Sequence, residues 1–298
     1  MSAEGKVYAP PQRSQRDWTL LAYKTKFVAW RILLYAVLIT GAIVFSMPLV
    51  WMISTSLKPE HLVFVMPIVW IPPEPAWANY VDAWKMLPFP TFYGNTIFIT
   101  TLNIIGLVLS SSLVAFGFAR VRFWGRDWIF IILLATMMLP PQVTLIPIYL
   151  FWSKLHLVNT FWPLIAPEWL TNAFNVFLLR QFFMSINTEL DDAARIDGAG
   201  WFTIYSRILM PLSKPALGVI AIMAFAWNWN NFLQPLIYLN ETKKFTIAIG
   251  LRLFETQQSQ RIAETMAMTL VAIIPVLLVF YLAQARFIRG IVITGVKG

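Results

Sequence analysis

The sequence contains no cysteine, which excludes disulfides, thiolate catalysis and cysteine-ligated metal sites. Its two histidines, His61 and His156, lie far apart and have no other ligands at metal-binding spacing, so no metal centre is expected. Charged residues make up only 12% of the 298 residues, whereas 58% are hydrophobic. A water-soluble domain of this size could hardly tolerate that balance. The composition therefore predicts a membrane protein, in contact with lipid.

The net charge of +9 does not indicate a nucleic-acid-binding protein. Lys and Arg are spread over short connections between apolar runs and form no concentrated basic stripe, so no nucleic-acid partner is expected. Residues 1–27 are polar and basic, and they lack the short apolar core and small-residue cleavage site of a signal peptide. We expect them to remain as an amino-terminal tail that is partly disordered.

Apolar runs long enough to cross a bilayer recur along the chain, since about 20 helical residues span a hydrocarbon core of ~30 Å. Six runs qualify, at about 32–55, 95–119, 128–150, 161–183, 215–239 and 264–286. Most of the 23 Lys and Arg fall in the two tails and in the connections on their side, so both termini are predicted to be cytoplasmic. The expected fold is an all-α polytopic membrane protein with six transmembrane helices, the third kinked at Pro140 and Pro141.

A polar loop at 187–214 separates the fourth and fifth predicted helices on the cytoplasmic side. Its acidic start and an Asp191–Arg195 spacing of four residues predict a first short helix up to Ile196. Gly198 and Gly200 permit a sharp turn, and a second helix is expected after them because apolar residues recur at helical spacing. These apolar residues are Trp201, Ile204, Tyr205 and Ile208. Pro211 and Pro215 are expected to break the chain before the fifth span. A plain interfacial helix lying in the headgroups is the alternative.

Within this loop the chain resembles the permease subunits of binding-protein-dependent ABC importers. Their motif reads Glu-Ala-Ala, three residues, Gly, nine residues, Ile, one residue, Leu-Pro. The corresponding residues here are Asp192, Ala193, Ala194, Gly198, Ile208 and Pro211. Asp192 replaces the Glu and Met210 replaces the Leu. The segments SLKPE, FLLRQFF, WNWNNFLQPL and GVKG extend the likeness to the carbohydrate-uptake branch, specifically the maltose- and glycerol-phosphate-type second permease.

The resemblance implies that residues 28–298 form the transmembrane domain of an ATP-driven importer of a sugar or sugar derivative, in a bacterial or archaeal cytoplasmic membrane. The implied partners are a second permease subunit, two cytoplasmic ATPase subunits that carry ATP and Mg, and an extracytoplasmic sugar-binding protein. No G-x-x-x-x-G-K-[ST] sequence occurs, so the chain is expected to hold no cofactor and to have no ATPase site of its own. The residues implied in ATPase coupling are Asp191, Asp192, Ala193, Ala194, Asp197, Gly198, Ala199, Ile208 and Pro211.

Polar residues inside the predicted spans suggest a path for a hydroxyl-rich solute. Amides recur every three residues in the fifth span, and two polar residues lie four apart in the fourth, so each set is expected to share a helix face. With neighbouring indole rings, such amides suit a weak sugar site. Hydrogen bonding to the partner permease is the alternative role. The candidate path residues are Glu168, Asn172, Trp227, Asn228, Trp229, Asn231 and Gln234.

The connections 57–94 and 240–263 are expected on the outer side, where aromatic and Arg residues would meet the binding protein or anchor the chain at the membrane surface. These residues are Trp70, Trp77, Tyr80, Trp84, Arg252 and Arg261. An ion-coupled secondary transporter of a small polar solute is the alternative function. The sequence offers it no convincing internal repeat, and only Glu168 lies clearly within a span.

Overall fold

The computed structural model describes residues 15–258 and 261–295, and the chain divides into two units, Met1–Ser54 and Thr55–Gly298. Within the described residues the regular structure is helical throughout, as the sequence predicts. The first fourteen residues of the expected tail, and most of the closing GVKG segment, lie outside the described residues. Residues 15–27 of the expected tail are helical.

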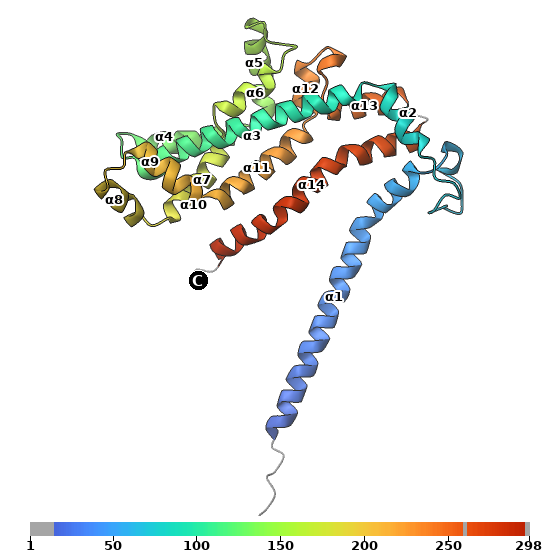
Figure 1. The fold of residues 1–298 in the computed structure, drawn as a ribbon, viewed down its shortest axis with the longest axis horizontal. Coiled ribbons are helices and arrows are strands. Elements are labelled where there is room, and N and C mark those ends of the chain that lie inside the picture. Colours follow the sequence, from blue (N-terminus) through green and yellow to red (C-terminus); the bar gives the residue numbers. More distant parts are fainter. Residues whose placement is uncertain (1–14, 259–260, 296–298) are drawn as a thin grey trace, which may run out of the picture. The chain divides into compact units, whose positions relative to one another are not determined.

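The first unit consists of most of helix α1 (Gln15–Ser56), drawn in blue in Figure 1. Between Tyr23 and Ser56, its most apolar 18-residue stretch has a mean hydropathy of 2.3. A helix that is apolar around its whole circumference is suited to lipid or to another apolar helix. The predicted span 32–55 lies within it.

The second unit is built around the long helix α3 (Phe89–Arg120), which carries no proline beyond its first turn. Helix α7 (Ala173–Ser185) packs along α3, and so does α11 (Lys214–Trp229). Helix α14 (Ile262–Gly295) packs in turn on α11, so that α3, α11 and α14 run side by side (Figure 1). Large aliphatic side chains such as Leu107, Leu179 and Ile220 fill the core between α3, α7 and α11.

Shorter elements complete this unit. They are η1 (Glu60–Leu62), α2 (Ala78–Met86), α4 (Arg126–Ala135), η2 (Thr136–Met138), α5 (Pro141–Lys154), α6 (Trp162–Trp169), α8 (Glu189–Ile196), α9 (Trp201–Thr203), η3 (Ile204–Leu209), α10 (Met210–Leu212), α12 (Leu233–Tyr238), η4 (Thr242–Lys244) and α13 (Ile247–Gln257).

Three of the predicted spans are broken, where the sequence suggested continuous helices. In the third, Arg126–Met138 and Pro141–Lys154 meet at 99°, far more than the predicted kink. Pro140 adopts an extended conformation and Pro141 begins α5, so two adjacent residues without an N–H separate the two helices.

The fourth and fifth predicted spans are also interrupted. Between α6 and α7, Thr171 has a φ of 89°, and the side chain of Asn172 accepts hydrogen bonds from the N–H groups of Phe174 and Asn175. This side-chain cap starts a new helix, because it satisfies N–H groups that have no helical partner. In the fifth, α11 ends at Trp229 and α12 begins at Leu233.

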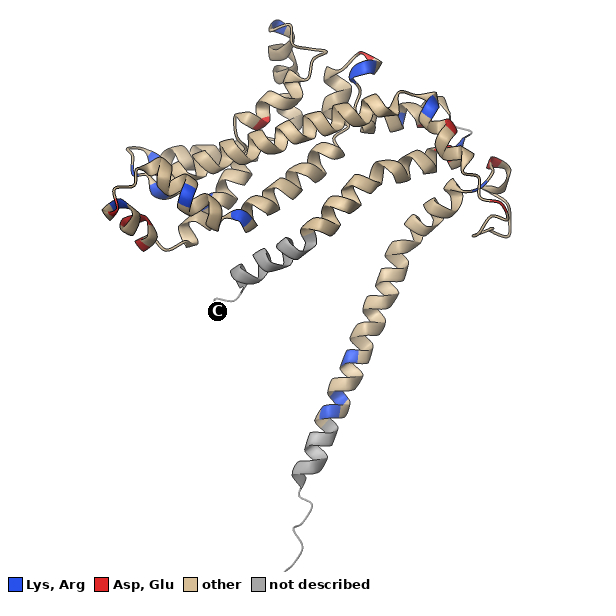
Figure 2. Cartoon of the chain, in the orientation of Figure 1, with Lys and Arg blue, Asp and Glu red and all other residues tan. Residues whose placement is uncertain are grey.

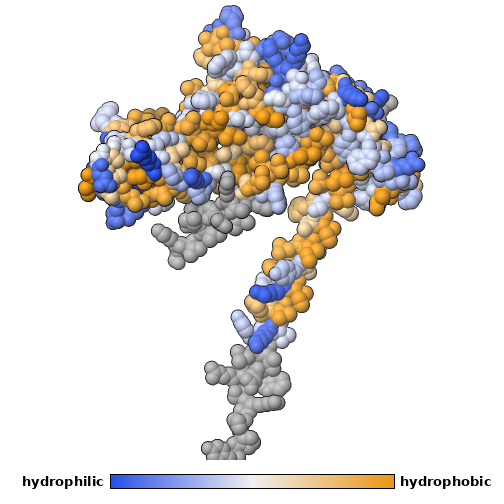
Figure 3. Space-filling model, viewed as in Figure 1, coloured by the Kyte–Doolittle hydropathy of each residue, from blue (hydrophilic) through white to orange (hydrophobic). Residues whose placement is uncertain are grey.

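Length and composition mark several helices as able to cross a membrane. Three qualify alone, at Tyr23–Ser56, Phe89–Arg120 and Ile262–Ala283, and two bent helix pairs qualify as broken spans. In the second unit, Figure 2 shows most charged residues near the ends of the long helices. Figure 3 shows broad hydrophobic areas on the visible face. Exposed apolar side chains on α3, such as Ile97, Phe98 and Leu113, suit contact with lipid or with another apolar subunit. The molecule is therefore a multi-pass membrane protein.

Candidate functional site: the 187–214 loop and a polar pocket

The 187–214 loop folds as two short helical segments joined at Gly198. Helix α8 ends at Ile196, and Gly198 takes a φ of +82°, the left-handed conformation that glycine adopts easily. The second segment is continuous from α9 through the π-helical turn η3 to α10. The loop therefore consists of a short helix, a turn at Gly198 and a second helical segment.

The predicted break before the fifth span is present, and it lies between Pro211 and Pro215. Pro211 lies in the first turn of α10, directly after η3, where a missing N–H is tolerated because the hydrogen-bond register changes there. The chain stays helical to Leu212 and bends by 76° only at Ser213. Pro215 lies in the first turn of α11, so it starts the next helix.

Asp191 faces the body of the protein and forms its ion pair with Arg120, and not with Arg195 four residues away. Its Oδ2 lies 2.8 Å from Nε of Arg120, the last residue of α3, and both side chains are almost fully buried. Arg120 also donates from Nη2 to the carbonyl of Ile186 at 2.8 Å. Arg195 instead places its guanidinium 3.9 Å from the centre of the Trp201 ring. Burial raises the pKa of Asp191 above its usual range, while Arg120 and Arg195 oppose this shift.

The predicted coupling residues divide between two faces of the loop. Asp191 is buried, and Ala194, Ala199 and Ile208 are partly buried against the core of the second unit. The other side is open to the surroundings, and Ile196 beside these residues is 87% exposed. The predicted coupling residues on the open side are Asp192, Ala193, Asp197, Gly198 and Pro211.

A small polar pocket lies between α3, α6 and the break after α11. Thr96, Thr100 and Asn103 line it from α3. Asn228, Asn231 and Thr246 line it from the other side. Within the described chain, three buried atoms facing this region have no hydrogen-bond partner: Thr100 Oγ1, Asn103 Oδ1 and Thr246 Oγ1. Unsatisfied buried polar atoms favour occupation by a water or another small polar group.

The candidate path residues are only partly brought together. Asn228 and Asn231 both reach the pocket, but Asn228 is bonded inside the bundle, where its Oδ1 accepts from Asn103 Nδ2. Asn231 donates to Gln234 Oε1 at 2.8 Å, across the start of α12. Because the helix is broken after Trp229, the expected single face for these amides is wrong.

The remaining path candidates lie apart from the pocket lining. Trp229 is 4% exposed and donates from Nε1 to the carbonyl of Ala272 in α14, so its ring is part of the core. Trp227 is 70% exposed. Glu168 lies in the last turn of α6, while Asn172 caps α7, so the predicted shared stripe is wrong.

Sequence reasoning missed the α3 side of the pocket and the role of Arg120. The signal for the pocket was present, because Thr96, Thr100 and Asn103 recur at four and three residues along one face of an apolar helix. Arg120 gave no such signal, since a basic residue at a helix end is ordinary.

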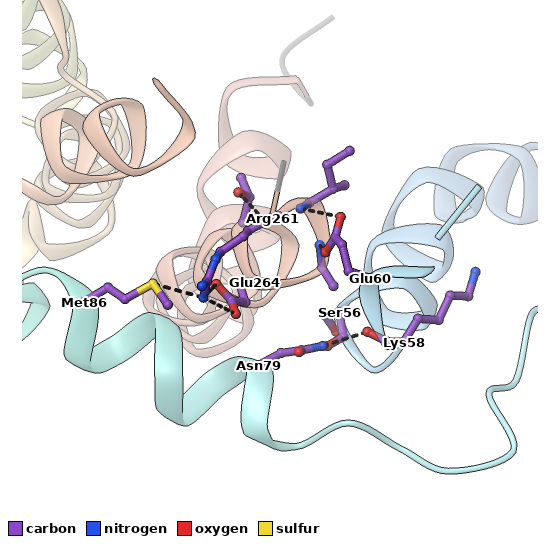
Figure 4. A network of polar contacts seen from close by, with 10 residues as sticks. Ser56, Lys58, Glu60, Asn79, Met86, Arg261 and Glu264 are labelled. Carbon is purple, nitrogen blue, oxygen red and sulfur yellow. Dashed lines mark hydrogen bonds and ion pairs between the residues drawn. The ribbon is translucent and has the colours of Figure 1, made fainter. Parts of the chain in front are cut away.

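A second polar network joins the two predicted outer connections, as Figure 4 shows. Asn79 of α2 donates to the carbonyls of Ser56 and Lys58, both at 2.8 Å. The carboxylate of Glu60 accepts from the backbone N–H groups of Ile262 at 2.9 Å and Ala263 at 3.1 Å, in the first turn of α14. We call these two bonds the Glu60 clasp.

The residues expected on the outer surface have mixed environments. Arg261 pairs with Glu264 at 3.0 Å, and Arg252 pairs with Glu255 at 2.6 Å. The Tyr80 hydroxyl bonds to Ser56, and Trp84 stacks on Phe89. Among the tryptophans, Trp77 at 65% and Trp70 at 41% are exposed.

Residues 106–292 match the family described as "Binding-protein-dependent transport system inner membrane component". Among curated relatives, the chain is 31% identical to the probable ABC transporter permease protein YurM of Bacillus subtilis, over 86% of this chain and 85% of YurM. It is 35% identical to the arabinooligosaccharides transport system permease protein AraQ of Halalkalibacterium halodurans, over 70% of this chain and 74% of AraQ. It is 31% identical to the sn-glycerol-3-phosphate transport system permease protein UgpE of Agrobacterium fabrum, over 89% of this chain and 96% of UgpE.

The fold is similar to that of a chain in the crystal structure of a bacterial ABC transporter involved in the import of the acidic polysaccharide alginate. The TM-score is 0.78 at 24% identity, with 93% of this chain and 100% of that chain covered. The apolar helices, the folded 187–214 loop and these matches agree with one another. The chain belongs to the family of binding-protein-dependent transport system inner membrane components.

Proposed function

We propose that this chain is the membrane-spanning permease subunit of an ATP-driven importer that moves a sugar or sugar derivative into the cytoplasm. The observation that carries the proposal is the 187–214 loop. It has the spacing of the importer motif, its inner side is fixed to α3 by the Arg120–Asp191 pair, and its outer side is free. A rigid projection with one open face is what docking to a separate ATPase requires.

The open face has the chemistry of a docking surface. Ile196 is 87% exposed and Phe202 is 74% exposed, beside the acidic side chains of Asp192 and Asp197. Apolar anchors surrounded by polar groups are typical of protein interfaces. We propose that two ATPase subunits, which bind ATP and Mg, take this loop and the matching loop of a second permease subunit.

The proposed solute class rests on the relatives. AraQ and UgpE are named for arabinooligosaccharides and sn-glycerol-3-phosphate, and the similar solved structure belongs to an alginate importer. A solved structure of a bacterial alginate ABC transporter in complex with an alginate pentasaccharide-bound periplasmic protein has a TM-score of 0.54 to this chain. On these grounds we propose an extracytoplasmic sugar-binding protein as the partner on the outer side.

The proposed topology has six spans and both termini in the cytoplasm. By length and composition, three continuous helices and two bent pairs qualify as up to five spans. In the second bent pair we propose Lys214–Trp229 alone as the membrane part, because Trp201–Leu212 belongs to the 187–214 loop. We propose α6 and α7 together as the sixth, because the fourth predicted apolar run covers both. The Lys and Arg distribution supports the orientation.

The proposal is tested by reconstitution in lipid vesicles with the second permease, the ATPase and the binding protein. Uptake of a labelled oligosaccharide or glycerol phosphate should require ATP and should persist when an ionophore removes ion gradients. Uptake that needs no ATP and stops with the ionophore would instead identify an ion-coupled transporter.

A further inference from the structure

Two buried polar links fasten α3 to the 187–214 loop. The first is the Arg120–Asp191 ion pair, which joins the end of α3 to α8 with 2.8 Å between Nε and Oδ2. The second is a hydrogen bond of 2.7 Å between the hydroxyls of Ser112 and Tyr205, which joins α3 to η3. Each half of the loop therefore has its own bond to the same helix.

The ion pair fixes the position of α8 relative to α3 more than it stabilises the fold. Removing two charges from water is costly, so a buried pair is often no more stable than an apolar replacement, while removing one partner leaves an unpaired buried charge. Arg120 also binds the carbonyl of Ile186, just before α8. These contacts fix the direction in which α8 leaves the bundle.

Helix α3 connects these links to the polar pocket. The pocket residues Thr96, Thr100 and Asn103 lie in its first half, and Ser112 and Arg120 lie in its second half. The helix has no internal proline, so the rise from Asn103 to Arg120 is about 25 Å along one unbroken helix. The α6–α7 segment is interrupted at Thr171. Helix α11 also reaches the pocket, at Asn228, but it is separated from the loop by the 76° bend at Ser213.

We propose that α3 is the lever of this subunit: the Arg120–Asp191 pair and the Ser112–Tyr205 bond make it move with α8, and α3 carries that movement to the polar pocket. The inference rests on the proposed function. Asp191, Arg120 and Tyr205 are positioning residues in this scheme, because they act through α3 and touch no solute.

The decisive measurement is the number of solute molecules taken up per ATP hydrolysed by the reconstituted complex. The neutral double variant Arg120→Met with Asp191→Leu removes the charges together, which avoids an unpaired buried charge. We expect an assembled complex with the wild-type thermal unfolding midpoint and about three- to tenfold less uptake per ATP. A purely structural pair would change the unfolding midpoint or the yield and leave this ratio at the wild-type value, which would overturn the proposal.

The milder pair Ser112→Ala with Tyr205→Phe removes two hydroxyls and keeps the ring packing, so it decides the question should the first variant fail to assemble. A lower ratio supports the lever, and a wild-type ratio in this variant overturns it. The matched control is Arg126→Gln with Asp127→Asn, which removes an ion pair whose Asp127 side chain is 72% exposed and should leave the ratio unchanged. If the wild-type complex itself shows no ATP-driven uptake, the proposed function is wrong. If the wild-type complex takes up solute but the variants leave uptake per ATP unchanged, only the lever proposal is wrong.

Discussion

Gly198 is the residue at which the loop depends most directly on backbone conformation. Its φ of +82° is costly for residues that carry a Cβ, although a Cβ built there would meet no atom within 4 Å. The requirement is therefore conformational and not steric. Gly200, two residues on, has an extended backbone with φ of −75° and imposes no such requirement.

Gly198→Leu is expected to cost about 1–2 kcal/mol in the native turn, because a left-handed conformation brings Cβ close to the following carbonyl. The complex should insert in the membrane but lose solute-stimulated ATP hydrolysis. Gly198→Asn should retain more stimulation, since Asn enters this region more readily. Gly200→Ala is the matched control and should behave as wild type. Equal stimulation in Gly198→Leu and Gly200→Ala would contradict the assignment.

Among the elements, the contact of α3 with α6 is sensitive to an added methyl group. A Cβ on Gly106 of α3 would overlap the indole ring of Trp169, whereas a Cβ on Gly117 of the same helix meets nothing within 4 Å. Small residues at such positions let membrane helices approach closely.

Gly106→Ala should therefore destabilise the bundle by about 1–3 kcal/mol through overpacking. Gly117→Ala should be neutral or slightly stabilising, because alanine has the better helix propensity. The thermal unfolding midpoint of the two detergent-solubilised variants, compared with wild type, gives the answer. A similar midpoint for both would show that Trp169 moves aside without cost.

The break between α11 and α12 gives the candidate path residues different expected roles. Asn228→Leu should lower the unfolding midpoint, since Asn103 loses one of its two acceptors inside the bundle and keeps only the Leu164 carbonyl. Such a bond contributes about 1 kcal/mol or less in membrane proteins. Gln234→Ala changes an exposed side chain and should keep stability while reducing uptake or altering sugar preference. Loss of stability in Gln234→Ala, with sugar preference unchanged, would make that amide structural as well.

The helix breaks also show where sequence reasoning stops. The length of the apolar runs predicted the helical fold, and Gly198 predicted the turn. Whether each helix is continuous could not be predicted in the same way. Asn172 begins α7 through a side-chain cap, and Trp229 at the end of α11 makes a tertiary contact with Ala272. Asp191 was assigned to Arg195 because local spacing was the available criterion; its partner, Arg120, lies 71 positions earlier in the numbering.

At the scale of the second unit, the Glu60 clasp joins the segment after α1 to the start of α14. Glu60 supplies two carboxylate oxygens to backbone N–H groups that have no partner within the helix. Negative charge is also favoured at a helix N-terminus. The clasp thus connects the segment near the start of the second unit to the last helix of that unit.

Glu60→Ala should destabilise the fold by about 0.5–2 kcal/mol, the usual effect of losing a side-chain cap. Glu60→Gln should lose less, because one amide oxygen still accepts. Glu74→Ala in the same connection is the control, since Glu74 is exposed. Unfolding midpoints that fall equally for Glu60→Ala and Glu74→Ala would deny the clasp this role.

The clasp also has a consequence for the order of assembly during synthesis. Its partners are 202 and 203 positions apart, so Glu60 leaves the ribosome long before the N–H groups of Ile262 and Ala263 exist. Every other helix of the second unit is made in the interval. The clasp therefore closes only after the last helix begins to insert, and a nascent chain halted before α14 leaves the Glu60 carboxylate open as a mark of an unfinished subunit.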